Sequence, residues 1–332
     1  MYKRLSLLFA ILLLLTGTIA CSDGEGRSST PTDNVITFSD SNLEIAIREA
    51  IGITEGAIHL SHLQELTTLH VQDDGITDIT GLEYCTNLTK LQLDFCQISD
   101  IAPISNLSNL ELLNLGYNAI RDISPLSGLH NLTVLYLIDN VIDDVSSLSG
   151  LTELTELDLG LNYIRDISPI SGLSNLRELS VGSNNIEDIS PLLNLKGLTL
   201  LYITNNPIED ISLISTFGNL VELAIGSCSI KDISAVSRLT SLDILYLLDN
   251  EIADIAPLAD LRNLSVLILD YNQISDISPL LENGGLGKGD TIDLFDNPLS
   301  DISVNDYIPQ LLDRGIDVRW SIRESPLEEV SK

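Results

Sequence analysis

Four histidines, at positions 59, 62, 70 and 130, are the first residues in the sequence that could bind a metal. His59, His62 and His70 are close enough in sequence to suggest a zinc site, because imidazole is a common ligand of that ion. The repeat described below places His70 on a strand and the other two on a preceding turn. We therefore expect surface or cap residues here, with no metal and no other cofactor.

Cysteines offer thiol or disulfide chemistry, and Cys85, Cys96 and Cys228 are the three that follow the N-terminal segment. In the repeat, Cys85 occupies a position that is leucine in other copies, and Cys96 and Cys228 occupy one that is asparagine. These two lie six copies apart, about 29 Å at the spacing of adjacent strands, which is too far for a disulfide. We expect three buried, inert thiols.

Two other stretches resemble catalytic or nucleotide-binding motifs but lack essential parts. The segment GGLGKGDT (284–291) is similar to a phosphate loop, yet Gly289 follows Lys288 where serine or threonine is required. No serine or cysteine nucleophile has a placed base, and no carboxylate pair stands out from the acidic background. The sequence predicts that the protein is not an enzyme.

Aspartates recur once every 22 residues from Asp78 to Asp276 and again at Asp301. Such a row of carboxylates could bind calcium, which prefers oxygen ligands. No glycine-rich calcium-binding pattern accompanies them. We favour local capping, in which Asp122, for example, accepts hydrogen bonds from backbone N–H groups just beyond it.

Most of these residues belong to a repeat of 22 residues without insertion. Its ten copies begin at positions 63, 85, 107, 129, 151, 173, 195, 217, 239 and 261. The copy at 107–128 has the pattern L-x-x-L-x-x-L-x-L-x-x-N-x-I-x-D-I-x-P-L-x-x. The L-x-L alternation predicts a short strand with one buried face, the asparagine follows where the chain turns, and D-I-x-P-L predicts a tight capped helical turn. Stacked copies would form an asparagine ladder.

This pattern resembles the bacterial leucine-rich repeat family, specifically its internalin-like class of 22-residue repeats. The resemblance implies an α/β leucine-rich repeat solenoid, a horseshoe with a parallel β-sheet on the concave face and 3₁₀ or short turns on the convex face. We divide the chain into an N-terminal cap (35–62) with a helix near 41–50, ten repeats (63–282), a last repeat with a C-terminal cap (283–320) and a tail (321–332). The cap includes a helix near 305–313, and Trp320 is expected over the last coil.

The N-terminus indicates export. Residues 1–20 have a basic start and an apolar run typical of a bacterial signal peptide. Ala20-Cys21 resembles a lipobox, which implies lipidation of Cys21 and a lipid anchor in the cell envelope; cleavage by an ordinary signal peptidase, giving a secreted protein, is the alternative. Residues 21–34 are polar and predict a flexible tether.

The formal net charge of −31 disfavours nucleic acid as a partner, since an acidic surface repels phosphates. The strands place apolar and aromatic side chains away from the core, interleaved with carboxylates, which is typical of a protein-binding surface. The predicted concave-face ligand-binding residues are Phe95, Tyr117, Val134, Tyr136, Ile138, Asp139, Asp158, Tyr163, Tyr202, Tyr246, Leu248, Asp249, Ile268, Asp270, Tyr271 and Phe295.

The resemblance implies adhesion or recognition of a protein ligand at a bacterial surface, and we expect a monomer. An envelope scaffold or a regulator of an exported enzyme is one alternative. Glycan binding, with the same tyrosines stacking on sugars, is another.

Overall fold

A computed structural model describes residues 33–71 and 75–321. The chain divides into residues 1–33 and residues 34–332, and the second unit carries the repeats. The predicted signal peptide, Cys21 and most of the tether lie outside the described residues, as does nearly all of the predicted tail.

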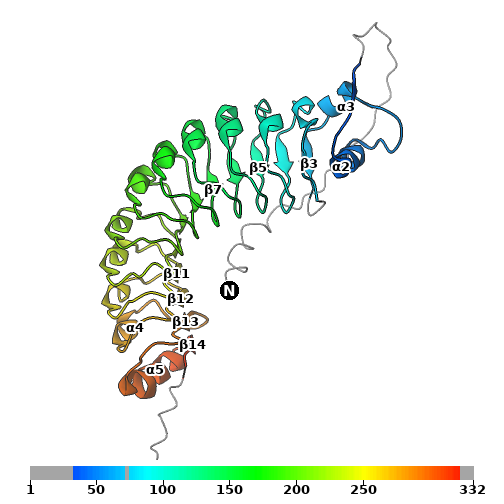
Figure 1. Cartoon of the computed structure of the whole chain (residues 1–332). Coiled ribbons are helices and arrows are strands. Elements are labelled where there is room, and N and C mark those ends of the chain that lie inside the picture. Colours follow the sequence, from blue (N-terminus) through cyan, green and yellow to red (C-terminus); the bar gives the residue numbers. More distant parts are fainter. Residues whose placement is uncertain (1–32, 72–74, 322–332) are drawn as a thin grey trace, which may run out of the picture. The chain divides into compact units, whose positions relative to one another are not determined.

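Twelve parallel strands form one sheet in strict sequence order, and they lie along the inner side of the curved repeat unit (Figure 1). Each strand has three residues, and the register joins equivalent positions, so that Leu157 lies beside Leu179. The strands are β3 (Thr68–His70), β4 (Lys90–Gln92), β5 (Leu112–Asn114), β6 (Val134–Tyr136), β7 (Glu156–Asp158), β8 (Glu178–Ser180), β9 (Leu200–Tyr202), β10 (Glu222–Ala224), β11 (Ile244–Tyr246), β12 (Val266–Ile268), β13 (Thr291–Asp293) and β14 (Asp317–Arg319). The predicted concave parallel sheet is confirmed.

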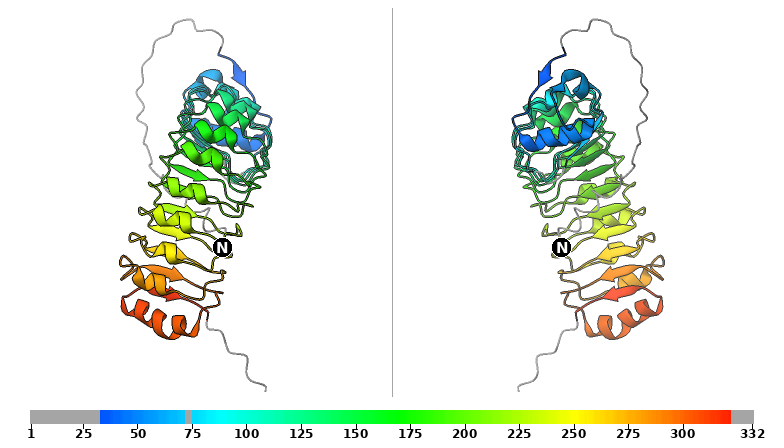
Figure 2. Two further views of the ribbon diagram at one scale, coloured as in Figure 1. Left: turned by 90° about the vertical axis from the view of Figure 1, so that its left-hand side faces the viewer. Right: turned by 90° about the vertical axis from the view of Figure 1, so that its right-hand side faces the viewer.

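The outer side of each coil is a short helical turn, as Figure 2 shows from two sides. Asp166 illustrates why the turn forms, because its Oδ1 accepts a hydrogen bond from the N–H of Ser168 at 2.7 Å and Pro169 fits the first turn. The 3₁₀ turns are η1 (Leu82–Tyr84), η2 (Ala102–Ile104), η3 (Ser124–Gly128), η4 (Ser146–Gly150), η5 (Ser168–Gly172), η6 (Ser190–Asn194), η7 (Ser212–Thr216), η8 (Ser234–Arg238) and η9 (Ala256–Leu258), and the next coil has an α-helical turn, α4 (Ser278–Glu282).

The N-terminal cap covers one end of the core. Helix α2 (Ser41–Ile51) begins where Asp40 accepts hydrogen bonds from the N–H groups of Asn42 and Leu43, and it ends at Gly52, which has a left-handed conformation. A two-stranded antiparallel sheet of β1 (Val35–Ile36) and β2 (Ile58–His59), followed by α3 (Leu60–Gln64), completes this cap. The predicted helix is confirmed, whereas α3 and the small sheet were not foreseen.

The C-terminal cap contributes a strand as well as helices. A π-helical turn, η10 (Ser303–Tyr307), continues into α5 (Ile308–Asp313), which confirms a helix near the predicted range. The chain then returns as β14, which pairs with β13. The prediction of eleven coils therefore missed the twelfth strand, because β14 follows the cap helix and carries no repeat motif. Trp320 packs partly buried against the core, as expected.

The core is a continuous column of leucine and isoleucine side chains from every coil, and Phe217 is the largest fully buried side chain. No helix in the described ranges is long and apolar enough to span a bilayer.

Candidate functional site: the concave sheet and its rim

Buried asparagines hold the coils, and therefore the strands, at fixed positions. Asn162 donates from Nδ2 to the carbonyl groups of Leu137 (3.0 Å) and Leu159 (3.1 Å), while its Oδ1 accepts the N–H of Ile142 at 2.9 Å. The same arrangement recurs at Asn118, Asn140, Asn184, Asn206, Asn250, Asn272 and Asn297. Each asparagine thus satisfies backbone groups of its own and the preceding coil, which confirms the predicted ladder.

Two rows of side chains leave the sheet on its open side. The first and third residues of each strand form these rows, which we call the first and second outward rows, while the middle residue enters the core. Val134 and Tyr136 in β6, and Ile244 and Tyr246 in β11, are partly exposed members of the rows. The open side therefore presents apolar and aromatic groups.

A third feature lies at the rim, where each strand ends. The residue immediately before the asparagine position has a positive φ in coil after coil, among them Phe95 (59°), Tyr117 (58°), Leu161 (55°) and Tyr271 (56°). Left-handed backbone is unfavourable by about 1 kcal/mol for such residues, and glycine would adopt it freely. Several coils nevertheless carry a large aromatic or apolar side chain at this position.

Exposed apolar groups gather on this rim over four neighbouring coils. The rings of Phe95 and Tyr117 stack with centroids 4.1 Å apart and planes 7° apart. Val141 and Leu161 are both 40% exposed, and Tyr163 is 59% exposed. Sequence reasoning missed Val141 and Leu161; their place beside the asparagine position is the signal that could have identified them.

Most of the predicted ligand-binding residues are accessible. The exposed or partly exposed ones are Phe95, Tyr117, Val134, Tyr136, Ile138, Asp139, Tyr163, Tyr246, Leu248, Asp249, Ile268, Tyr271 and Phe295. They come from both ends of the sheet, with Phe95 and Tyr117 near one end and Tyr271 and Phe295 near the other.

Three predicted residues are buried instead: Tyr202 is 7% exposed, Asp158 is 3% exposed and Asp270 is 2% exposed. The Asp158 carboxylate turns back to accept the N–H of Gly160 at 2.9 Å, and Asp270 accepts the N–H of Phe295 at 2.8 Å. Tyr202 lies toward Glu222 in the next coil and donates its hydroxyl to that carboxylate. The expectation that these side chains are exposed is wrong, because neighbours on the curved sheet cover them.

Tyrosine and glutamate pair across adjacent coils. Tyr136 donates its hydroxyl to Glu156 at 2.6 Å, as Tyr202 does to Glu222. Burial, and then the neighbouring glutamate, raises the pKa of each of these phenols, so both are neutral donors. Tyr246 has no such partner in the part of the chain that the structure describes, because Val266 occupies the equivalent position of the next strand.

Carboxylates of the central coils are desolvated without a nearby cation. Burial raises the pKa of Asp158 to about 6, although Gly160 and Ser180 donate hydrogen bonds to it. Burial, followed by repulsion from Glu156 and Glu222, raises the pKa of Glu178. The outward rows of β5 to β13 contain no lysine or arginine; Lys90 in β4 and Arg319 in β14 lie beyond them.

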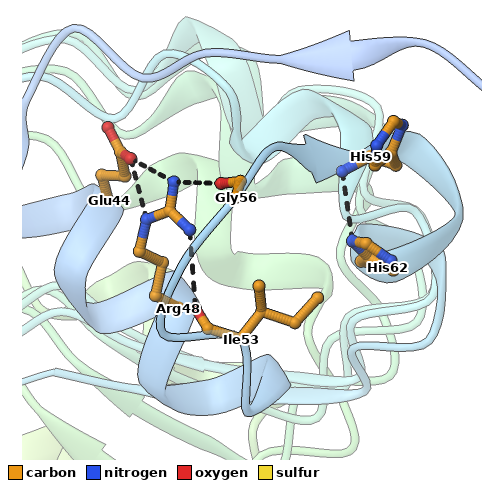
Figure 3. Close-up of polar contacts among 6 residues, drawn as sticks. All are labelled: Glu44, Arg48, Ile53, Gly56, His59 and His62. Carbon is orange, nitrogen blue, oxygen red and sulfur yellow. Dashed lines mark hydrogen bonds and ion pairs between the residues drawn. The ribbon is translucent and has the colours of Figure 1, made fainter.

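The three neighbouring histidines considered first for chemistry are divided between the N-terminal cap and strand β3. His59 and His62 lie at the start of α3, where the His59 N–H donates to Nδ1 of His62 at 3.1 Å (Figure 3), while His70 is exposed on β3. In the described ranges no three His, Cys, Asp or Glu side chains are grouped as metal ligands. Arg48 joins Glu44 to the carbonyl of Gly56 in the same cap.

The thiols and the aspartate row also agree with the sequence interpretation. Cys85, Cys96 and Cys228 are buried and form no disulfide with one another, and burial raises the pKa of Cys85 to about 12. Capping through the N–H two residues ahead occurs at Asp78, Asp100, Asp122, Asp144, Asp166, Asp188, Asp210, Asp232, Asp254 and Asp276.

Comparison with known proteins supports this architecture. The profile described as Leucine Rich repeats (2 copies) matches residues 86–128, 108–150, 130–172, 174–216 and 240–283. The crystal structure of an internalin (inlF) from Listeria monocytogenes is similar with a TM-score of 0.73 and 33% identity, covering 86% of this chain and 91% of that chain. No curated protein matches the sequence.

More distant structures share the fold alone. A TDR receptor has a TM-score of 0.64 and 19% identity, covering 72% of this chain and 48% of its own. TLR13 in its complex with ssRNA13 has a TM-score of 0.62 and 23% identity, covering 78% of this chain and 41% of its own.

Proposed function

The chain belongs to the leucine-rich repeat family, and from that premise we propose that it is a non-enzymatic recognition protein whose concave sheet and rim bind a protein ligand. One observation carries the proposal: the open side of the sheet presents partly exposed tyrosine, valine, isoleucine and leucine side chains in β5, β6, β11 and β12, and no described element covers them. Exposed apolar and aromatic surface of this kind is typical of protein interfaces.

Rigidity makes the surface suitable for recognition. The asparagine ladder fixes the spacing of the strands, so little conformational entropy is lost when a ligand binds. Aromatic residues held in left-handed backbone at the rim, Phe95, Tyr117 and Tyr271, present large rings without freedom of the main chain.

We further propose that the protein acts outside the cytoplasm of a bacterium, as a monomer on a lipid anchor at Cys21. The apolar N-terminal run and the lipobox-like Ala20-Cys21 support export, and the similarity to an internalin agrees with it. Replacement Cys21→Ser should move the protein from the membrane fraction to the soluble fraction. Unchanged fractionation would remove the lipid anchor from the proposal.

The ligand-binding proposal is tested by affinity capture with the purified protein from envelope extracts and culture medium. The double variant Tyr136→Ser/Tyr246→Ser removes one aromatic ring from each apolar part of the sheet and should abolish capture while leaving the far-UV circular dichroism unchanged. The control is Tyr84→Ser, because Tyr84 is an exposed tyrosine on the outer turn η1. Loss of capture in the control alone would move the site to the outer side.

The alternatives give different results in the same assay. Capture of one exported enzyme, together with inhibition of its activity, would identify a regulator. Retention on immobilised glycans, lost in the same double variant, would identify a glycan-binding protein.

A further inference from the structure

Side chains on the outward rows change character along the sheet. Apolar groups occupy β5 and β6 (Leu112, Val134, Tyr136) and again β11 and β12, and we call these two sets the flanking apolar segments. The second set consists of Ile244, Tyr246, Val266 and Ile268. Between the two sets, the first outward row contains Glu156, Glu178, Leu200 and Glu222, and we call its three glutamates the central carboxylates.

One strand of each flanking segment, β6 in the first and β11 in the second, presents nearly the same surface five coils apart. Val134, Tyr136 and Ile138 in one match Ile244, Tyr246 and Leu248 in the other, and the corresponding residues have the same burial classes. Ile138 lies against Gly116 of the preceding coil and Leu248 lies against Gly226, where a Cβ would approach these side chains to 2.9 Å. Because glycine has no side chain at these two positions, Ile138 and Leu248 can lie against the neighbouring coil.

Two of the three central carboxylates are held in place before any ligand arrives. Tyr136 fixes Glu156 and Tyr202 fixes Glu222, each through a hydroxyl donated across coils. Glu178 lies between them, beside Glu156 in the sheet register, and has no hydrogen-bond partner in the described residues. Three acidic groups are thus positioned over four coils.

Nothing in the described chain neutralises these groups. Its ion pairs join Arg48 to Glu44, Arg121 to Asp143, Lys231 to Glu251, and Arg319 to Asp293 and Asp317, and none reaches a central carboxylate. Repulsion among Glu156, Glu178 and Glu222 remains in the free protein, and a bound cation would relieve it.

Resting on the proposed function, we infer that the ligand is a protein segment with lysine or arginine side chains at its centre and apolar side chains on both sides. The basic centre contacts Glu156, Glu178 and Glu222, and the apolar sides contact the flanking apolar segments. Charge complementarity at the centre selects the ligand, whereas the apolar contacts supply most of the binding free energy.

Strand spacing sets the length of that segment. From β6 to β11 there are five strand intervals of ~4.8 Å, or about 24 Å. An extended chain covers this distance with about seven residues, and an α-helix with about sixteen. Either form fits within a peptide of sixteen residues, which is therefore a suitable probe.

The test is selection of binders from a displayed library of random sixteen-residue peptides on the purified protein. We expect enrichment of peptides with a basic centre and apolar sides. Binding of a selected peptide should weaken at least about tenfold in Glu156→Gln/Glu178→Gln/Glu222→Gln and also weaken as salt is raised. The control Glu153→Gln/Glu187→Gln/Glu209→Gln changes the net charge equally at exposed positions off the strands and should bind like the wild type.

The outcomes separate this inference from the proposal on which it rests. The inference of a basic ligand segment is wrong if the selected peptides are not enriched in lysine or arginine. It is also wrong if the central and the control glutamine variants bind the peptide equally. If the central variant binds normally while Tyr136→Ser/Tyr246→Ser does not, the concave face is the site but its ligand is not cationic. If the tyrosine variant also binds every selected peptide normally, the concave site itself is wrong.

Discussion

Carboxylates on the outer turns and carboxylates on the concave sheet behave in opposite ways. On the outer side, Asp122, Asp166, Asp210 and Asp232 each accept a backbone N–H of the following serine, which lowers their pKa. On the sheet, burial raises the pKa of Asp158, Glu178 and Glu222. Relative to the unfolded chain, folding therefore stabilises the charged form of the carboxyl group on the outer side of a coil and destabilises it on the sheet.

The difference shows which of the two sets of carboxylates stabilises the fold. A lowered pKa means that the folded state stabilises the charge, so the outer aspartates contribute stability above about pH 4. A raised pKa means that the charged group opposes folding at neutral pH. Of these three sheet carboxylates, Glu178 and Glu222 remain partly exposed on the open sheet, which agrees with the proposed role of this face in recognition.

The largest effect is expected from Asp158→Asn. The pKa of Asp158 is about 6 against 3.8 in its ordinary state, so the folded chain binds a proton more tightly than the unfolded chain. Its contribution to stability is therefore favourable at low pH and falls as pH rises from about 4 to about 6. The variant should raise the free energy of unfolding at pH 7 by about 2 to 3 kcal/mol, measured by urea unfolding.

The chain already contains an asparagine at the equivalent position two coils away, which serves as a comparison for this variant. Asn114 occupies the equivalent position in β5, and its Oδ1 accepts the N–H of Gly116 at 3.0 Å, so asparagine fits there without strain. The gain should vanish below about pH 4. A loss of stability at pH 7 would show that the Asp158 charge supports the fold, and the contrast between the two faces would fail.

The next largest effect is expected from Asp40→Ala in the N-terminal cap. Burial raises the pKa of Asp40, but hydrogen bonds from the backbone of Asn42, Leu43, Thr77 and Asp78 outweigh it and lower the net value. Removing this acceptor should reduce the free energy of unfolding at pH 7 by about 2 kcal/mol. The loss should shrink as pH falls through the lowered pKa, and Asp40→Asn should lose less because it keeps an acceptor oxygen.

A smaller decrease is expected from Asp166→Ala on the outer side. Among the described residues its carboxylate accepts only from the N–H and hydroxyl of Ser168, at 2.7 and 3.0 Å, so the thermal midpoint should fall less than for Asp40→Ala.

Addition of a chelator should leave the wild-type thermal midpoint unchanged, because the row of aspartates on the outer side caps turns. A large drop on chelation would restore the calcium interpretation.

The sequence predicted those structural roles that one residue type performs at one fixed position of the repeat. Asn162 and Asp166 act through hydrogen bonds to backbone groups at fixed offsets, so their roles followed from the period. Burial of Asp158, Tyr202 and Asp270 did not follow, because alternation gives the side from which a side chain leaves a strand but not what covers it on a curved sheet.

Two further features could not be predicted from the repeat pattern. The backbone is left-handed at Phe95, Tyr117 and Leu161, but none of these positions is glycine, the residue that usually indicates this conformation. The exposed rim was therefore only partly predicted. Strand β14 pairs in register with β13, and its sequence, Asp317–Arg319, lacks the leucine alternation.

The smallest effect on stability is expected from Glu178→Gln, which should raise the free energy of unfolding at pH 7 by less than about 1 kcal/mol, because the group is only half-buried and solvent screens it. The gain should shrink in high salt, since it comes from removing repulsion with Glu156 and Glu222. The matched variant is Glu153→Gln, at an exposed position off the sheet, and urea unfolding of both at two salt concentrations is the measurement. An equal gain from Glu153→Gln would assign the effect to the net charge of −31, and the repulsion would then belong to the whole surface rather than to the concave face.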